Sequence, residues 1–424
     1  MLKKLAILFV ALCFLRPIVT AQVQNDTLQV TLSASEKMFL DSNLLILAEK
    51  YNVDASKALI IQSKLLPNPN FSIAHGLYSG SIHQFFPTGN NDETSAQLSQ
   101  LILLADKRNK QIRLAQANEK LNEYQFYDLI RTLKYTLRND FFHIYYLQQS
   151  EQVYDKEITA LQKVVTAFEE QEGKGYIAEK EVIRIKAELY NLQNEYADLQ
   201  NQVNDLQSEL KLLLQVRSTK YVDPLPDSTS LAGLDPAKYT LTALLDSAYE
   251  NRSDLLIAKT NSTISNLNYD YQRSLAVPDL TLSVGYDEQG SFLTNFYSVG
   301  ASIDLPFFNH NQGNTRSAKA MMDYNAATQK STQSTVDENV TRALQKAYTE
   351  DKLYKAIDPK FAGDFDNLTQ QVLINYEKRN IGLLDFLDFY DSYKQNVLAT
   401  NYLKYSRVQS FEDINFYTGT NFFN

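Results

Sequence analysis

The sequence predicts a mainly α-helical protein whose strands belong to a membrane β-barrel. Three observations lead to this fold class. Apolar residues recur at spacings of three and four over long stretches, which is typical of packed helices. Two ten-residue segments alternate apolar and polar residues, and a tilted strand needs about that length (~9–11 residues) to cross a bilayer. The order helix, proline, strand hairpin, long helical hairpin occurs twice, so the chain consists of two similar units.

Residues 1–21 have the features of a secretory signal peptide. Lys3 and Lys4 precede an apolar run, and Ala21 ends a short stretch before Gln22. Removing the segment takes away three of the 41 basic residues and no acidic residue, so the net charge becomes 38 − 50 = −12. An acidic mature chain argues against nucleic acid as a partner. Cys13 is the only cysteine, so the mature chain would have no disulfide.

Residues 22–216 form the first predicted unit. Its initial helices end near Pro69. Two strands and a helical hairpin are then expected, at about 71–78, 94–102, 107–172 and 177–216. At ~1.5 Å per residue, the first helix of the hairpin would be on the order of 100 Å long.

Residues 217–240 are rich in proline and small polar residues, which predicts a linker or equatorial segment. Residues 241–424 form the second unit and end in a C-terminal tail. Its strands and hairpin helices are expected at about 280–289, 296–305, 313–376 and 381–412. Pro359 falls within the third of these ranges, so that helix should kink or restart there.

The two units match at nearly constant offsets. The matches are residues 95–99 with 298–302 and Arg113 with Arg316, 203 apart, and Ile177 with Ile381 and Glu181 with Asp385, 204 apart. Loops change length easily, so this constancy indicates that the total length of the helices is constrained.

Four strands cannot close a barrel. An open sheet would leave two unpaired edges in lipid, where each unsatisfied backbone group costs several kcal/mol. Closure therefore requires several copies, and two, three or four chains would give eight, twelve or sixteen strands. The pattern alone does not choose among these numbers.

The long apolar seams alone would also fit a soluble periplasmic coiled-coil adaptor or scaffold, but such a protein has no need for duplicated alternating strands. We find no catalytic constellation, so an enzyme is not expected, nor is a cofactor. His310 between two asparagines is a poor metal site, and we predict no metal.

These features together resemble the TolC-like outer-membrane efflux proteins, and most closely the CzcC-like branch of heavy-metal and cation efflux systems. The resemblance rests on the signal segment, the duplicated pattern, the junction at residues 305–313 and the segment 376–388. Its barrel-to-helix junction residues are Pro69, Pro278, Pro306, Asn309 and Gly313.

The resemblance implies a homotrimer in the outer membrane of a Gram-negative cell, with a large periplasmic portion. Each chain would give four strands to one twelve-stranded barrel, continued by a periplasmic α-helical barrel. The trimer would be the passive exit duct of a tripartite efflux system, fed by an inner-membrane RND-type pump through a periplasmic adaptor. Its substrates would be cations or small toxic molecules, while protein export by type I secretion stays open as an alternative.

The resemblance also implies a periplasmic gate at Tyr376, Arg379, Asp385 and Asp388. The last two are three residues apart and so share a helix face. Around a threefold axis they would form carboxylate rings, which attract cations and raise the carboxyl pKa values. The family's basic gate residue falls at Ile381 here, and Arg379 is the candidate to replace it.

The resemblance further implies that two turns at the ends of the hairpins are adaptor-docking tips. Their residues are Gly175, Ile177, Glu181, Ile381 and Gly382. The alternative interpretation is simple turn chemistry, because glycine permits the positive φ that ends a helix.

Overall fold

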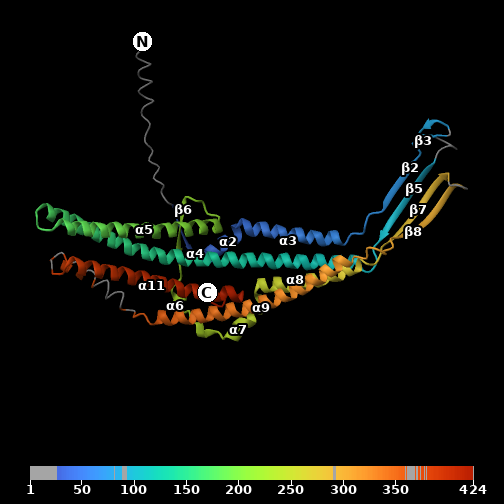
Figure 1. Cartoon of the computed structure of the whole chain (residues 1–424). Coiled ribbons are helices and arrows are strands. Elements are labelled where there is room, and N and C mark those ends of the chain that lie inside the picture. The colour runs from blue at the N-terminus through green and yellow to red at the C-terminus, as the bar shows by residue number, and fades with distance from the viewer. Residues whose placement is uncertain are drawn as a thin grey trace, which may run out of the picture.

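The structure is a computed structural model that describes residues 26–80, 82–87, 93–289, 293–358, 360, 368, 371–372, 374–376, 378 and 380–423. The predicted signal peptide at 1–21 and the candidate gate residue Arg379 therefore lie outside the described residues. The molecule is elongated and mainly helical, with a small sheet at one end and the turns of the helical hairpins at the other (Figure 1).

The first half contains β1 (Asp26–Thr31), α2 (Leu32–Ser42), α3 (Leu44–Ser63), β2 (Asn70–His75), β3 (Tyr78–Ser79), β4 (Gln84–Phe85), β5 (Thr94–Ile102), α4 (Lys107–Gly173) and α5 (Glu179–Leu214). The second half contains β6 (Lys220–Leu225), α6 (Ser228–Ala232), η2 (Pro236–Lys238), α7 (Leu241–Asn251), α8 (Ser253–Ser274), β7 (Leu280–Gln289), β8 (Thr294–Ile303), α9 (Gln312–Lys355) and α11 (Leu383–Thr418).

Four antiparallel strands form the sheet, in the order β2-β5-β7-β8. The alternation predicted for β7 and β8 places their apolar residues on one face of the sheet. On that face Leu282 lies opposite Ala301, and Val284 lies opposite Val299. Val299 is 87% exposed although it is apolar. The outer strands β2 and β8 each pair with only one neighbour among the described residues.

Several boundaries differ from those expected. β2 ends at His75 rather than 78, and Tyr78 pairs instead in the short β3–β4 hairpin. β8 ends at Ile303 rather than 305, just before Pro306, which has no N–H to donate. α11 continues to Thr418, beyond the predicted end at 412.

The predicted helix 313–376 is not continuous. α9 ends at Lys355, and the chain turns at Ala356, whose N–H donates to the carbonyl of Lys352. The physical reason lies in the sequence, since a proline at 359 would remove one helical hydrogen bond and clash with the preceding turn.

The linker 217–240 is more ordered than expected. Its segment β6 pairs in parallel with β1, which the sequence analysis did not predict. Val222 is fully buried, and its backbone N–H and carbonyl bond the side-chain amide of Gln207 on α5 at 3.0 and 2.6 Å. The linker is therefore fixed to the helical body at its centre.

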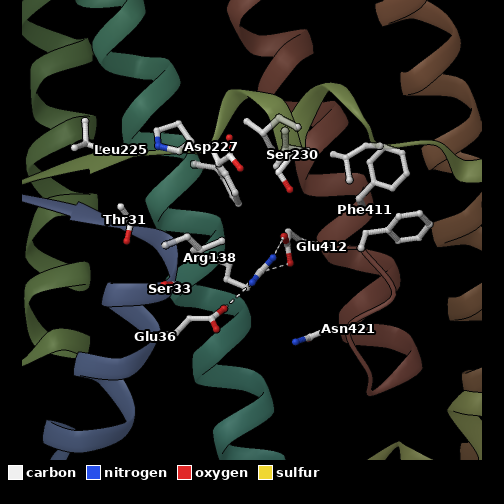
Figure 2. Close-up of a pocket in the computed structure, with 17 residues that line it drawn as sticks. Thr31, Ser33, Glu36, Arg138, Leu225, Asp227, Ser230, Phe411, Glu412 and Asn421 are labelled. Carbon is white, nitrogen blue, oxygen red and sulfur yellow. Dashed lines mark hydrogen bonds and ion pairs between the residues drawn. The ribbon is translucent and has the colours of Figure 1, made fainter.

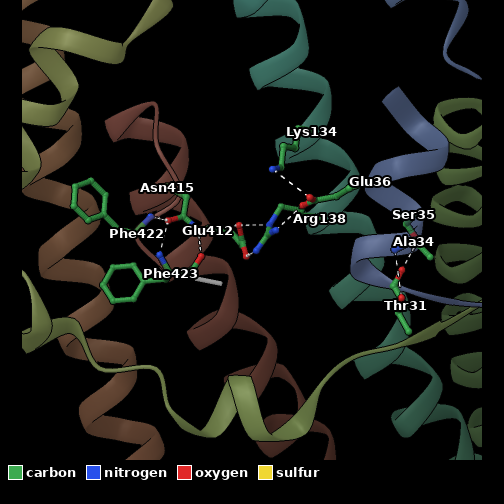
Figure 3. A network of polar contacts seen from close by, with 10 residues as sticks. All are labelled: Thr31, Ala34, Ser35, Glu36, Lys134, Arg138, Glu412, Asn415, Phe422 and Phe423. Carbon is green, nitrogen blue, oxygen red and sulfur yellow. Dashed lines mark hydrogen bonds and ion pairs between the residues drawn. The ribbon is translucent and has the colours of Figure 1, made fainter. Parts of the chain in front are cut away.

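An ion cluster joins α2, α4 and α11 beside this linker. The guanidinium of Arg138 donates two hydrogen bonds to the carboxylate of Glu412 and one to Glu36, each 2.6 Å long (Figure 3). Lys134 makes a second ion pair with Glu36 at 3.3 Å. The side chains of Arg138 and Glu412 are both 7% exposed. A cavity of about 820 Å³ adjoins the cluster, bounded by the linker and by Phe411 (Figure 2).

Candidate gate and docking site at the helix tips

The first tip turn ends α4 through a glycine with a positive φ. Gly175 has a φ of +74°, and the N–H of Tyr176 donates back to the carbonyl of Gln171 at 2.9 Å. A side chain at this position would be strained, so turn chemistry accounts for this glycine. α5 then begins with Glu179 and Glu181 in its first turn, where the helix dipole favours negative charge.

The second tip turn is built differently. The N–H of Asn380 donates to the carbonyl of Asn375 at 2.8 Å, and Phe386 donates to the carbonyl of Gly382 at 3.0 Å. Gly382 has a φ of −78° and extended backbone. The expectation that both tip glycines supply a positive φ is therefore wrong for Gly382.

The two tips lie side by side and enclose a groove of about 510 Å³. Five predicted site residues line it: Ile177 and Glu181 from the first tip, and Tyr376, Ile381 and Gly382 from the second. Residues some 200 positions apart in sequence are thus brought together. Gly175, Asp385 and Asp388 are not part of the groove wall.

Tyr376 is the most buried of the three candidate gate residues that the structure describes. It is 7% exposed, its ring stacks on Phe386 with centroids 4.3 Å apart, and it contacts Phe168 at 5.7 Å. Its hydroxyl is buried and has no hydrogen-bond partner among the described residues. Burial, and secondarily the charge of Glu181, raise the pKa of Tyr376. The site therefore holds a buried hydroxyl without a partner among the described residues, and Glu181 lines the same groove.

Asp385 and Asp388 lie near the start of α11, and both are exposed. Asp385 is in the first turn, where a carboxylate interacts favourably with the helix dipole. Phe386, between them, is fully buried and anchors this turn in the tip core. Both carboxylates are thus held at defined positions on a packed helix.

The junction between sheet and helices carries an ion pair that sequence reasoning missed. Lys107 begins α4 and is 4% exposed, and its ammonium contacts a carboxylate oxygen of Asp279 at 2.7 Å and the carbonyl of Val277 at 2.6 Å. Asp279 directly follows the predicted junction residue Pro278. A lysine at the start of a long helix, a few residues after a strand, was the available signal.

Three other predicted junction residues, Pro306, Asn309 and Gly313, lie where the second hairpin joins α9. Pro306 follows β8, and the side chain of Asn309 accepts the N–H of Asn311 at 3.1 Å. Asn311 precedes α9 and binds the carbonyl of Gln272 at 2.8 Å. Gly313 lies in the first turn of α9, and Pro69 immediately precedes β2.

In the part of the chain that the structure describes, no helix is both long and apolar enough to span a bilayer. Within the same residues, no three histidine, cysteine or acidic side chains are grouped so that they could hold a metal ion.

The chain is similar to known outer-membrane proteins. Residues 244–420 match the family model described as outer membrane efflux protein. The cobalt-zinc-cadmium resistance protein CzcC of Cupriavidus metallidurans is 22% identical over 295 residues, which cover 69% of this chain and 67% of CzcC.

Solved channels share the fold over nearly the whole chain. The Campylobacter jejuni CmeC outer membrane channel has a TM-score of 0.75 and 16% identity, covering 92% of this chain and 86% of CmeC. CusC has a TM-score of 0.72 and 15% identity, covering 95% of each chain. These similar proteins are channels rather than enzymes. The resemblance drawn from the sequence is thereby confirmed: the chain is similar to the outer membrane efflux proteins, whose family model matches residues 244–420, and this similarity assigns it to the outer membrane.

Proposed function

We propose that three copies of this chain form one channel in the outer membrane, with the strands of all three closing a twelve-stranded barrel and their long helices forming a periplasmic tube. One observation carries the proposal: within the described residues, the four-stranded sheet has two unpaired edges, and it exposes apolar residues such as Phe71 and Val299. A sheet of this kind is costly both in water and in lipid unless further strands complete it.

The channel would be a passive exit duct. An inner-membrane RND-type pump would supply the energy, and a periplasmic adaptor would dock on the helix tips, where the groove is lined by the apolar Ile177 and Ile381 and by the acidic Glu181. Cations are the favoured substrates, because the mature chain is acidic and because CzcC is a cobalt-zinc-cadmium resistance protein. Cleavage after residue 21 and export belong to the same proposal.

The gate would lie at the same tips. Tyr376 would close the second tip by stacking on Phe386, and Glu181, which lines the same groove, is the candidate acceptor for its hydroxyl. Asp385 and Asp388 would face the narrow end of the tube, where a ring of carboxylates concentrates cations.

The mass and shape of the detergent-purified mature protein test this function directly. Light scattering should give a particle of three chains, and negative-stain images should show a long hollow stem. A monomer or slender dimer that stays in solution without detergent would contradict the channel and favour the coiled-coil scaffold.

The double variant Asp385→Ala, Asp388→Ala tests the gate. Removing both carboxylates should relieve repulsion between copies and lower the local cation concentration, so that single-channel conductance in planar bilayers changes and selectivity for K⁺ over Cl⁻ falls severalfold. Asp323→Ala is a suitable control, because this exposed carboxylate lies on α9, far along the chain from the tips. A current–voltage curve identical to that of the unmodified channel would count against the assignment.

A further inference from the structure

Lys394 ties α11 to the helical hairpin of α4 and α5 below the tips. Its side chain on α11 is 7% exposed, and its ammonium contacts the carboxylate of Glu195 on α5 at 2.8 Å. Asp391, three residues earlier on α11, is a second partner at 3.2 Å. Because the ammonium is largely shielded from water, loss of its carboxylates would leave a poorly solvated charge, which is strongly unfavourable. The position of α11 on the hairpin therefore depends on which carboxylates this ammonium binds.

Glu157 on α4 is a further carboxyl group beside this ammonium. The residue is 4% exposed, and within the described part of the chain its Oε1 atom has no hydrogen-bond partner. Lys394 makes its ion pairs there with Glu195 and Asp391 instead, although its charge also acts on Glu157. From its own helix Glu157 faces Tyr154, whose hydroxyl donates to Glu195 at 3.4 Å. Glu157 is thus a buried acid that competes for a cation already bound elsewhere.

The groups that face Glu157 from the neighbouring helices are mostly acidic. Glu188 and Glu195 lie on α5, and Asp391 and Lys394 lie on α11. If all four carboxyl groups were ionised, the single ammonium would leave a net charge of 1 − 4 = −3. Burial is the main reason that the pKa of Glu157 rises to about 8; Lys394 opposes this rise, and the three acidic neighbours add to it. The packed arrangement is therefore most favourable when Glu157 is protonated.

We propose that Glu157 is a positioning residue for the gate, and that its protonation holds α11 against the hairpin of α4 and α5. Neutral Glu157 leaves Lys394 on Glu195. Ionised Glu157 competes for the same ammonium and adds a negative charge at the contact between α4 and α11, so that water must enter or α11 must move away. The inference rests on the proposed channel, because the gate on which Glu157 acts belongs to that proposal.

Movement of α11 at Lys394 would reach the second tip. Phe386 lies 394 − 386 = 8 residues nearer the start of the same helix, which is about 12 Å at ~1.5 Å per residue. Its ring stacks on Tyr376, and Asp385 and Asp388 lie beside it in the sequence. Because α11 is one continuous helix, the proposed gate residues on it would move together with Lys394.

The direction of the pH effect follows from the raised pKa of Glu157. Release of α11 would expose the carboxyl group to water and return its pKa towards the usual value of 4.5. The released state then binds fewer protons than the packed state between pH 4.5 and about 8, so the packed state loses stability as pH rises through this range. We expect α11 to be held most tightly in mildly acidic solution and to loosen as the pH approaches about 8.

A single tryptophan can report this release, because the chain contains none. Tyr390→Trp places it on α11, where Tyr390 is 7% exposed and its ring lies 4.5 Å from that of Phe386, centroid to centroid. Acrylamide is uncharged, so its quenching of tryptophan emission reports exposure without a charge effect of its own. Measured on the full chain in detergent between about pH 6 and about pH 9, the quenching constant should rise severalfold, with a midpoint near the pKa of Glu157 at about 8.

Glu157→Gln in the same background should keep the low quenching constant throughout, because its neutral amide mimics the protonated carboxyl group. Glu157→Met is a second neutral variant, without an amide that needs hydrogen-bond partners. Asp140→Asn is the matched control. Asp140 also lies on α4, is 2% exposed and has a pKa that burial raises to about 8, but it is 157 − 140 = 17 residues away, about 25 Å along the helix. This variant should keep the transition.

A quenching constant of Tyr390→Trp that does not change with pH would overturn the inference. A transition that persists in both neutral variants of Glu157, or that Asp140→Asn abolishes, would overturn it as well. The reporter and Glu157 belong to one chain, so the mass of the particle is a separate result. Three chains without the transition would overturn this inference alone, and one chain with the transition would overturn the proposed channel alone.

Discussion

Arg138→Ala is expected to destabilise the protein by about 3–5 kcal/mol, because it leaves the buried carboxylate of Glu412 without its cation and takes a second cation from the partly buried Glu36. Glu412 would lose both of its 2.6 Å hydrogen bonds from the guanidinium, and Glu36 would keep only the 3.3 Å contact with Lys134. The measurement is urea-induced loss of the helical circular dichroism signal at fixed protein and detergent concentration.

Lys120→Ala on the same helix provides the matched control. Lys120 pairs with Glu123 three residues away, and its side chain is 47% exposed, so its loss should cost about 0–1 kcal/mol. A second variant, Arg138→Met with Glu412→Leu, removes both charges of the main pair and should recover part of the loss. If Arg138→Ala costs no more than Lys120→Ala, the ion cluster does not stabilise the fold.

The Arg138 cluster also shows what the sequence could not reveal. Glu36 lies 102 residues before Arg138, and Glu412 lies 274 residues after it, on three different helices. In the sequence, each of the three lies among other charged residues with a helical spacing. Nothing local distinguishes a charge on a solvated helix face from one that is buried against another helix. The same holds for the parallel pairing of β1 with β6, which joins segments about 190 residues apart.

Periodicity predicted the long elements well because packing repeats along them. The seam through Ile185, Leu189 and Leu192 is buried, as the spacing of three and four indicated. Asp140 occupies a seam position in α4 and is buried although it is charged in water, and burial raises its pKa to about 8. The helical spacing alone does not tell whether water or protein surrounds a charged residue at such a position.

The tip site was predictable in part, because each turn carries a local signal and the duplication relates one turn to the other. Ile177 and Ile381 were matched by their offset, and both line the groove. The stacking of Tyr376 on Phe386 was not predicted, since it depends on how the chain folds across the turn at Gly382. A carboxylate ring would be formed by several copies, and a single chain does not contain it. The gate role of Asp385 and Asp388 is therefore a proposal.

Leu199→Pro is expected to abolish the assembled channel. Leu199 is 8% exposed in the core below the tips, in the middle of α5. A proline there removes one helical hydrogen bond and clashes with the carbonyl of Glu195, at a cost of about 3 kcal/mol or more, before the lost packing of the leucine is counted. The kink would also displace Glu195, whose carboxylate binds the buried ammonium of Lys394 on α11 at 2.8 Å.

Glu179→Pro separates this effect from a general intolerance of proline in α5. Glu179 is the first residue of the helix, where no helical N–H bond is lost, and Ala178 before it has the extended backbone that a following proline requires. Both variants should be extracted from the membrane fraction and analysed by size exclusion in detergent. Because the tube needs straight helices of constant length, Glu179→Pro should give the normal oligomer and Leu199→Pro none. Normal oligomer yield from Leu199→Pro would mean that α5 is not part of a continuous helical wall.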